Sequence, residues 1–374
     1  MPKDAPAGEG AAPLADATVM PYGLDVLSRD ERFELSIYQG FLAGVKTYWR
    51  GDLYAKVKGK AEAIGGNDPE AIERKMQGDP DYFLYSWLER RGQQFKYGGR
   101  GGLQTLATKH AAEFAARLPP PDTSAKAIST VPGYVSDFDV HQHPKGLWSD
   151  MANAVAHEWY QTGHSFSGVG TDAMVDTYVG AIVDHMPPDG RVLDLGCTLG
   201  RMSTALRQAA PGATIVGADV SEPVIRLARV KAAQRGLDIA FHQENSEDLP
   251  FEDVSFDVVA SHWLFHELPK AAIGRTLDET ARLLKPGGWT VIFDMYHVPG
   301  GTIGQWFHAG YGVRNNEPFG EGYVHYDLRS ALARRGFTDI EMSNFDPEIG
   351  GLRWVEDLPA KRTHYNTVVV ARKA

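Results

Sequence analysis

One stretch of the chain constrains the fold more than any other. Residues 191–219 begin with an apolar strand that runs into Asp194-Leu195-Gly196, continue through a turn to Gly200 and a helix, and end a second strand on Asp219. A strand, glycine turn and helix bring backbone N–H groups close to a ligand at the start of the helix. An acid at the tip of the next strand is placed to accept hydrogen bonds from ribose hydroxyls. The stretch therefore predicts a βαβ unit that binds a nucleoside.

The spacing of the glycines indicates which nucleoside is bound. A dinucleotide site uses G-x-G-x-x-G, so that the backbone can wrap a pyrophosphate. Here the pattern is Asp194-x-Gly196-x-x-x-Gly200, with a carboxylate before the first glycine. A carboxylate at this position repels a pyrophosphate and suits a cationic ligand. NAD is therefore the weaker alternative.

The stretch resembles the first motif of the class I S-adenosylmethionine-dependent methyltransferases. Four further segments match the family's motifs in order and spacing: 220–223, 245–251, 256–259 and 283–288. The resemblance implies a doubly wound, seven-stranded Rossmann-like sheet and S-adenosylmethionine as cofactor. In the family, the carboxylate at Asp194 helps to hold the positively charged methionine end. Thr198 stands where the family usually has a glycine, and Asn245 where it usually has an aspartate that faces the adenine amino group.

The resemblance also implies which residues line the cofactor. These are Tyr160, Asp194, Gly196, Cys197, Gly200, Asp219, Val220, Asn245, Ser246 and Ser261. Cys197 is the only cysteine of the chain, so no intrachain disulfide can form. A lone cysteine inside a turn is more often a small packing residue than a nucleophile. We interpret it in that way.

The pattern of apolar residues divides the 374-residue chain into four parts. Residues 1–20 are interpreted as a disordered tail, 21–118 as a helical domain, 119–146 as a linker and 147–374 as the methyltransferase domain. Expected strands of the sheet are 191–195, 214–218, 239–243, 256–261, 290–295, 339–343 and 366–371. A capping box at Ser28 starts a helix whose apolar face, which includes Phe33, Ile37 and Phe41, is expected to bury against a core or a second subunit.

Methyl transfer to a hydroxyl, thiol or protonated amine requires a base. The candidate bases His262, His266 and His297 follow the fourth and fifth expected strands. Residues 296–326 are expected to form a long loop at the acceptor pocket, with a subunit contact as the alternative. The candidate acceptor-binding residues are His164, Trp263, Tyr296, Trp306 and Tyr311. His141 and His143 could form a metal-binding pair, but we interpret them as polar loop histidines and predict no metal site.

Charge and composition limit the partners. The formal net charge of −10 argues against a nucleic-acid partner, and the basic stretch 90–100 is interpreted as a solvated face. No apolar run approaches the roughly 20 residues that span a bilayer. The absence of a signal peptide and of paired cysteines favours a cytoplasmic enzyme, with a homodimer as a possible assembly. The predicted function is methyl transfer to a small-molecule acceptor whose reacting atom the sequence leaves open. The alternative is a non-catalytic relative that uses the fold for binding or dimerisation.

Overall fold

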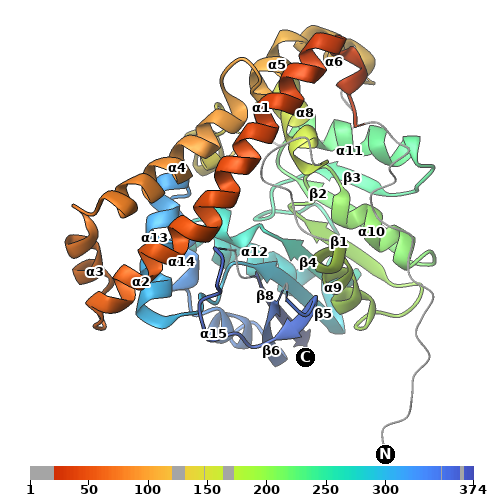
Figure 1. Cartoon of the computed structure of the whole chain (residues 1–374). Helices are drawn as coiled ribbons and strands as arrows, with labels where there is room; N and C mark the ends of the chain where they lie inside the picture. Colours follow the sequence, from red (N-terminus) through yellow and green to blue (C-terminus); the bar gives the residue numbers. More distant parts are fainter. Residues whose placement is uncertain (1–20, 120–130, 147, 163–171, 347, 363–365) are drawn as a thin grey trace, which may run out of the picture.

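A twisted sheet of eight strands organises the C-terminal part of the computed structural model (Figure 1). The structure describes residues 21–119, 131–146, 148–162, 172–346, 348–362 and 366–374, so the predicted tail and His164 lie outside the described residues. The strands run in the order β3-β2-β1-β4-β5-β8-β6-β7. Their bounds are β1 Arg191–Leu195, β2 Thr214–Asp219, β3 Ala240–Gln243, β4 Phe256–His262, β5 Leu284–Asp294, β6 Phe337–Asp346, β7 Gly351–Arg353 and β8 Asn366–Lys373.

Parallel pairing brings the carboxyl ends of β1, β2 and β4 to one edge of the sheet. Leu195 of β1 pairs with Ala218 of β2 and with Ser261 of β4. Val192, Leu193 and Leu195 are buried, as expected for a central parallel strand that is covered on both faces. The strand order reverses between β1 and β4, which is where open α/β sheets bind ligands.

The predicted doubly wound sheet is confirmed, with one strand more than expected. The additional strand is β7, a three-residue segment that pairs with the end of β6 and is too short to show a periodic pattern. Strand β5 begins at Leu284, before the predicted start at residue 290, because Leu284 pairs with Phe256 ahead of the Lys285-Pro286-Gly287-Gly288 segment.

Helices cover both faces of the sheet (Figure 1). Core clusters lie on either side of β1, one including Leu193 and Leu277 of α12, and the other including Val192 and Leu206 of α10. The helices of this part are α9 Asp172–Val183, α10 Arg201–Ala209, α11 Glu222–Gln234, η4 Phe265–Glu267, α12 Lys270–Leu283, α13 Gly301–Asn315, α14 Gly320–Val324 and α15 Leu328–Ala333. No helix among the described residues combines the length and apolar character that crossing a membrane requires.

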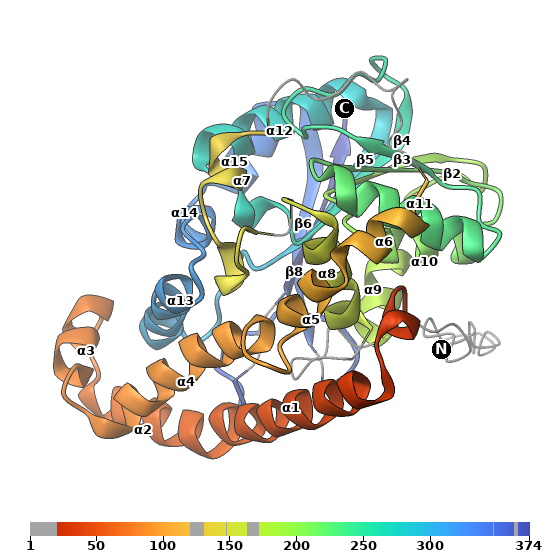
Figure 2. The same cartoon turned by 90° about the horizontal axis from the view of Figure 1, so that it is seen from above.

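Every regular element within residues 21–119 is helical, as predicted. These elements are η1 Leu24–Val26, α1 Arg29–Tyr48, η2 Trp49–Leu53, α2 Tyr54–Ile64, α3 Pro69–Met76, α4 Pro80–Tyr97, α5 Leu103–Lys109 and α6 Ala111–Arg117. The capping box is present, since Glu31 N donates to Ser28 Oγ (3.2 Å) and Ser28 N donates to the Glu31 carboxylate (2.8 Å). Figure 2 shows α1 and α4 reaching along one side of the sheet domain.

The predicted apolar face of α1 does not pack in a core of this chain. Phe33, Ile37 and Phe41 are 60–67% exposed, whereas Leu35 and Leu42 are buried. Two apolar stripes share this helix, and the packing against α4 and α5 selects the one that also carries Glu31 and Gln39, whose polar groups find partners there. The subunit interface that the exposed stripe would provide stays a prediction.

Residues 296–326 form helices rather than the predicted long loop. Helix α13 packs against α3 and α4, and its Trp306 and Phe307 join the core formed by Trp49, Tyr54 and Tyr85. A buried ion pair between Arg314 of α13 and Glu89 of α4 fixes the same contact. The glycines that suggested a loop are tolerated because tertiary packing stabilises the helix.

Between the helical region and α9, the described residues form α7 Gly133–Ser136, η3 Val140–Gln142 and α8 Met151–Gln161. Trp159 of α8 is fully buried in a core that also holds Phe114 of α6 and Leu227 of α11. The N-terminal helices therefore share a core with the sheet domain, which gives this part of the molecule a defined position over the carboxyl ends of the strands.

Candidate functional site

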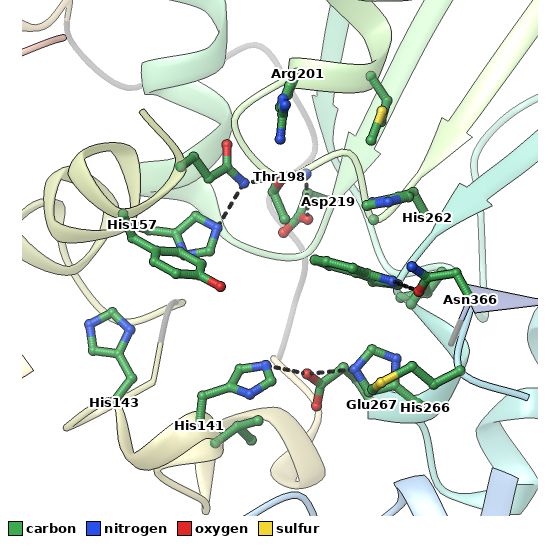
Figure 3. A pocket seen from close by; sticks show the side chains of 18 of the residues that line it. His141, His143, His157, Thr198, Arg201, Asp219, His262, His266, Glu267 and Asn366 are labelled. Carbon is green, nitrogen blue, oxygen red and sulfur yellow. Dashed lines mark hydrogen bonds and ion pairs between the residues drawn. The ribbon is translucent and has the colours of Figure 1, made fainter. Parts of the chain in front are cut away.

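A pocket of about 1000 Å³ lies between the carboxyl ends of β1, β2 and β4 and the N-terminal helices (Figure 3). One wall holds Asp194, Gly196, Thr198 and Asp219 from the strand ends and turns. The opposite wall is formed by α4, α8 and the segment 133–146, and its lining side chains include Lys96, Tyr97, Tyr134, Phe138, His141, His143, His157 and Tyr160. The sheet and the helical region thus enclose one space.

Asp194 is a buried carboxylate at the end of β1. The Ser203 hydroxyl donates a hydrogen bond of 2.6 Å to its Oδ2. Burial, with the nearby Asp219 charge, raises the pKa of Asp194 to about 7. Among the described side chains no cation forms an ion pair with this carboxylate. A ligand with a positively charged amino group would complement it, so this end of the pocket fits the methionine end of S-adenosylmethionine.

The turn after β1 has the left-handed backbone that a glycine-rich motif provides. Gly196 (φ 68°), Thr198 (φ 45°) and Gly200 (φ 72°) all have positive φ. A Cβ on Gly200 would lie 2.5 Å from the Phe241 ring, so this position accepts only glycine. Thr198 therefore adopts a left-handed conformation that favours glycine, despite its branched side chain and at a cost in strain.

Asp219 lies at the tip of β2, facing the turn. Its carboxylate accepts hydrogen bonds from Thr198 N (3.1 Å) and Ser221 N (2.9 Å), and burial raises its pKa. These contacts fix the side chain in the position from which it can accept ribose hydroxyl donors. Asn245 and Ser246 follow β3 and line the same end of the pocket, as do Cys197 and Val220.

Lys96 is the main residue that the sequence interpretation missed. It belongs to the stretch 90–100, in which Arg90, Arg91 and Arg100 are exposed as predicted. Lys96 itself is 2% exposed, and its Nζ lies over the rings of Tyr97 (4.4 Å) and Tyr160 (4.2 Å). The pKa of Lys96 is lowered well below its ordinary value, by burial and then by Lys46. Its helical position, on the face of α4 opposite the exposed Arg91, is the signal that could have found it.

Three of the histidines have strongly different environments. Burial lowers the pKa of His262 to about 3, and its ring stacks on Trp263. Burial opposes protonation of His266 too, but Asp294, whose Oδ1 is 2.6 Å from His266 Nδ1, and Glu267 raise its pKa well above the ordinary value. For His141, burial is likewise outweighed by Glu317 and Glu267, which raise the pKa to about 9.

The structure brings together most of the predicted site residues and separates others. Tyr160, His262, Trp263, His266 and Tyr311 line the pocket. The predicted residues that the pocket lining does not include are Gly200, Ser261, Tyr296, His297 and Trp306, while His164 lies outside the described residues.

The reasons for these exclusions are specific contacts. His297 stacks on Trp354 and places Nε2 3.0 Å from Val355 O, while the Tyr296 hydroxyl donates to Tyr326 O. Trp306 Nε1 donates to Glu73 of α3. None of these three side chains lines the pocket, so the roles in catalysis or acceptor binding predicted for them gain no support from their positions.

Comparisons with known proteins agree with the sequence motifs. A family described as "Methyltransferase domain" matches residues 192–288. A demethylmenaquinone methyltransferase from Thermus thermophilus is 38% identical over 114 residues, which are 30% of this chain and 51% of that protein. An uncharacterized methyltransferase from Synechocystis is 30% identical over 153 residues, 41% of this chain and 69% of the relative.

The chain thus spans about half the length of the first of these relatives. A solved SAM-dependent methyltransferase from Methanosarcina mazei is also similar, with 23% identity, a TM-score of 0.38, and coverage of 51% of this chain and 96% of the other. The motif order, the left-handed backbone of the turn after β1 and the sequence relatives lead to one assignment. The chain belongs to the class I S-adenosylmethionine-dependent methyltransferases.

Proposed function

We propose that the protein transfers a methyl group from S-adenosylmethionine to a small acceptor that binds in the pocket beside the cofactor. The observation that carries this proposal is that a single pocket joins the cofactor residues of β1 and β2 to the wall containing Lys96 and His141. Such a pocket can hold donor and acceptor together and exclude water from them.

The cofactor supplies an already activated methyl group, which leaves in an in-line displacement. The chain therefore has to bind, orient and, for a protic acceptor, accept a proton. In this proposal Asp194 holds the charged amino group, Asp219 the ribose hydroxyls and Asn245 the adenine edge. The turn 196–200 brings backbone close to the cofactor because its left-handed residues turn the chain sharply.

The environment of Lys96 favours an acceptor with an acidic O–H, S–H or N–H group. A lysine with a lowered pKa favours the neutral amine, which can take a proton, and the resulting ammonium then pairs with the acceptor anion. Among the described residues no carboxylate forms an ion pair with Lys96, so an acceptor anion would be its partner. Aromatic lining residues, among them Tyr97, Tyr134, Phe138 and Trp148, suit a flat acceptor.

The relatives suggest a narrower class of acceptor molecule. By its name, the Thermus thermophilus relative acts on demethylmenaquinone. A quinol ring carries ionisable hydroxyls and a flat aromatic face, which would suit both Lys96 and the aromatic wall. We therefore propose a quinol-like or phenolic ring as the acceptor class.

Calorimetric titration tests the cofactor part of the proposal. S-adenosylmethionine and its demethylated product are titrated into wild-type protein and into Asp219→Ala, with the exposed Asp238→Ala as control. We expect binding by the wild type and the control, and a loss of binding in Asp219→Ala. Folded wild-type protein that binds neither ligand would contradict the proposal.

A turnover assay with hydroquinones, phenols, thiols and carboxylic acids then tests the acceptor. Release of demethylated cofactor that depends on a phenolic or quinol acceptor supports the proposed class. Turnover only with another class would overturn that class, and cofactor binding without turnover on any acceptor would favour the non-catalytic alternative. Size-exclusion chromatography with light scattering would test the predicted homodimer.

A further inference from the structure

We propose that His141, His266 and Glu267 bind a divalent transition-metal ion on the acceptor side of the pocket. One donor atom from each residue lies within 4.8 Å of the other two. His141 Nε2 is 2.9 Å and His266 Nε2 is 3.4 Å from the same oxygen, Glu267 Oε1. Figure 3 shows the two imidazoles on either side of the Glu267 carboxylate. These separations suit donors that share one ion, since metal–ligand bonds of about 2.0–2.2 Å place neighbouring ligands about 3 Å apart.

The second nitrogen of each imidazole faces its own carboxylate. His141 Nδ1 is 2.7 Å from Glu317 Oε1, and His266 Nδ1 is 2.6 Å from Asp294 Oδ1. A carboxylate at Nδ1 fixes the ring orientation and directs Nε2 toward the ligand, and metal-binding histidines in proteins usually have such a partner. The cluster therefore has both the donor atoms for an ion and the carboxylates that orient the two imidazole donors.

The carboxylate behind His266 is itself held rigidly. Phe265 N (2.8 Å) and His266 N (3.2 Å) donate to Asp294 Oδ2, and Met295 N (2.7 Å) donates to Oδ1. Asp294 is fully buried at the end of β5, and Glu317 is 4% exposed. The orientation of the His266 ligand is thus fixed by the end of β5.

Two imidazoles and one carboxylate are a donor set typical of Zn²⁺ and other first-row divalent ions. All three residues line the pocket, so an ion held by them would be accessible to an acceptor molecule. A coordinated hydroxyl or thiol loses its proton more readily, which would add to the role proposed for Lys96. This use of the ion rests on the proposed function, whereas metal binding itself does not.

The same contacts also suit two protonated imidazoles held by three carboxylates. Metal titration distinguishes the two states. Wild-type protein treated with a chelator is titrated with Co²⁺ alone, followed by its visible absorption, and with Zn²⁺ alone by calorimetry. We expect one equivalent of either ion to bind, and Zn²⁺ to displace Co²⁺ with loss of the absorption.

The variants His141→Asn and Glu267→Gln test the ligands. His141 has a 39% exposed side chain, so its replacement should leave the fold intact, and circular dichroism and cofactor titration report on folding. The exposed His325→Asn is the matched control. We expect metal affinity at least about tenfold weaker in the two ligand variants and unchanged in the control.

Two outcomes would overturn the proposal. One is a wild-type protein that binds S-adenosylmethionine but neither metal ion. The other is stoichiometric metal binding that is the same in wild type, His141→Asn and Glu267→Gln, which would place the ion elsewhere. A protein that binds metal at these residues but not the cofactor would contradict the proposed function and leave the metal site supported.

Discussion

The two ends of the pocket are built in different ways. The end proposed to bind the cofactor, called the cofactor end below, takes Asp194, Thr198 and Asp219 from one strand–turn–helix–strand unit of 191–219. The end proposed to bind the acceptor, called the acceptor end below, takes Lys96 from α4, His141 from η3 and His266 from η4, three segments that are far apart in the chain. A local unit fixes the geometry of the first end, whereas the second end depends on long-range packing.

This difference predicts that the two ends can be disturbed separately. The wall of the acceptor end, formed by α4, α8 and the segment 133–146, is here called the acceptor wall. It is held in place by contacts such as Glu89–Arg314 and by the aromatic core around Trp306 and Phe307. The cofactor end is held by the hydrogen bonds and φ angles of its own turn. Substitutions at each end should therefore change different measurements.

The largest expected effect is on the acceptor wall. Glu89→Gln leaves Arg314 buried without its carboxylate, and we expect the free energy of unfolding to fall by about 3–5 kcal/mol, measured by urea denaturation. The exposed pair Glu113–Arg117 provides the control, since Glu113→Gln should cost less than about 1 kcal/mol. Cofactor affinity of the folded Glu89→Gln protein should stay near the wild-type value. A loss of cofactor binding in folded protein would show that the two ends are not independent.

The next effect concerns Asp194 and has a defined pH dependence. We expect Asp194→Asn to weaken S-adenosylmethionine binding by about 100- to 1,000-fold at pH 8, because a buried charge partner is lost. In the wild type, affinity should fall about tenfold per pH unit below pH 7, since the carboxyl must first lose its proton. Calorimetry between pH 5.5 and about 8.5 measures both.

Stability should show the opposite trend with pH. The folded-state pKa of Asp194, about 7, lies above the ordinary value of 3.8, so folding favours the neutral acid. The Asp194 contribution to the free energy of unfolding therefore decreases as pH rises from about 4 to 7 and stays low above 7. Asp194→Asn should remove this dependence and be more stable than wild type at pH 8 without cofactor. A less stable variant would contradict the burial argument.

A smaller effect is expected at the acceptor end, at Lys96. Lys96→Met should lower kcat/KM for the acceptor by about 100-fold, the lower end of what a positioned base contributes, with unchanged cofactor affinity. Lys96→Arg separates charge from proton transfer, because arginine stays charged and accepts no proton. If Lys96 acts as the base, both variants lose activity and regain part of it at high pH. Full activity of Lys96→Arg would assign the residue a purely electrostatic role.

The residues of the cofactor end were predictable from the sequence because their determinants are local. The glycine spacing, the strand pattern and Asp219 all lie within one short stretch, and the order of five motifs indicated the sheet. Strand β7 was not predicted because it has only three residues, and these form a strand by pairing with β6. The interpretation of 296–326 failed since a glycine-rich helix is stabilised by its contacts and not by its own propensity.

The acceptor end could not be predicted from the sequence because its side chains are brought together by tertiary packing. Whether Phe33 or Leu35 faces inward depends on which side of α1 meets α4, and two apolar stripes make both answers plausible. His141 and His143 looked equivalent, yet His143 stacks on Tyr97 at 4.0 Å while His141 meets Glu267. Periodicity and composition give an element and its polarity, but the partner of a side chain comes from tertiary packing.

The smallest expected effect tests whether the cofactor turn really needs a threonine. Thr198 has φ 45°, a conformation that costs a β-branched residue about 1–2 kcal/mol and costs glycine nothing. Thr198→Gly removes this strain. It also removes the weak contact from Gln161 Nε2 (3.5 Å) and increases the conformational entropy of the unfolded chain. We therefore expect a gain of about 1 kcal/mol or less in the free energy of unfolding and S-adenosylmethionine affinity within about threefold of wild type. Thr198→Val keeps the strain and lacks the hydroxyl, so it serves as the matched control. Strong loss of cofactor affinity in both variants would show that the hydroxyl of Thr198 contacts the cofactor, which would make this departure from the family pattern a functional one.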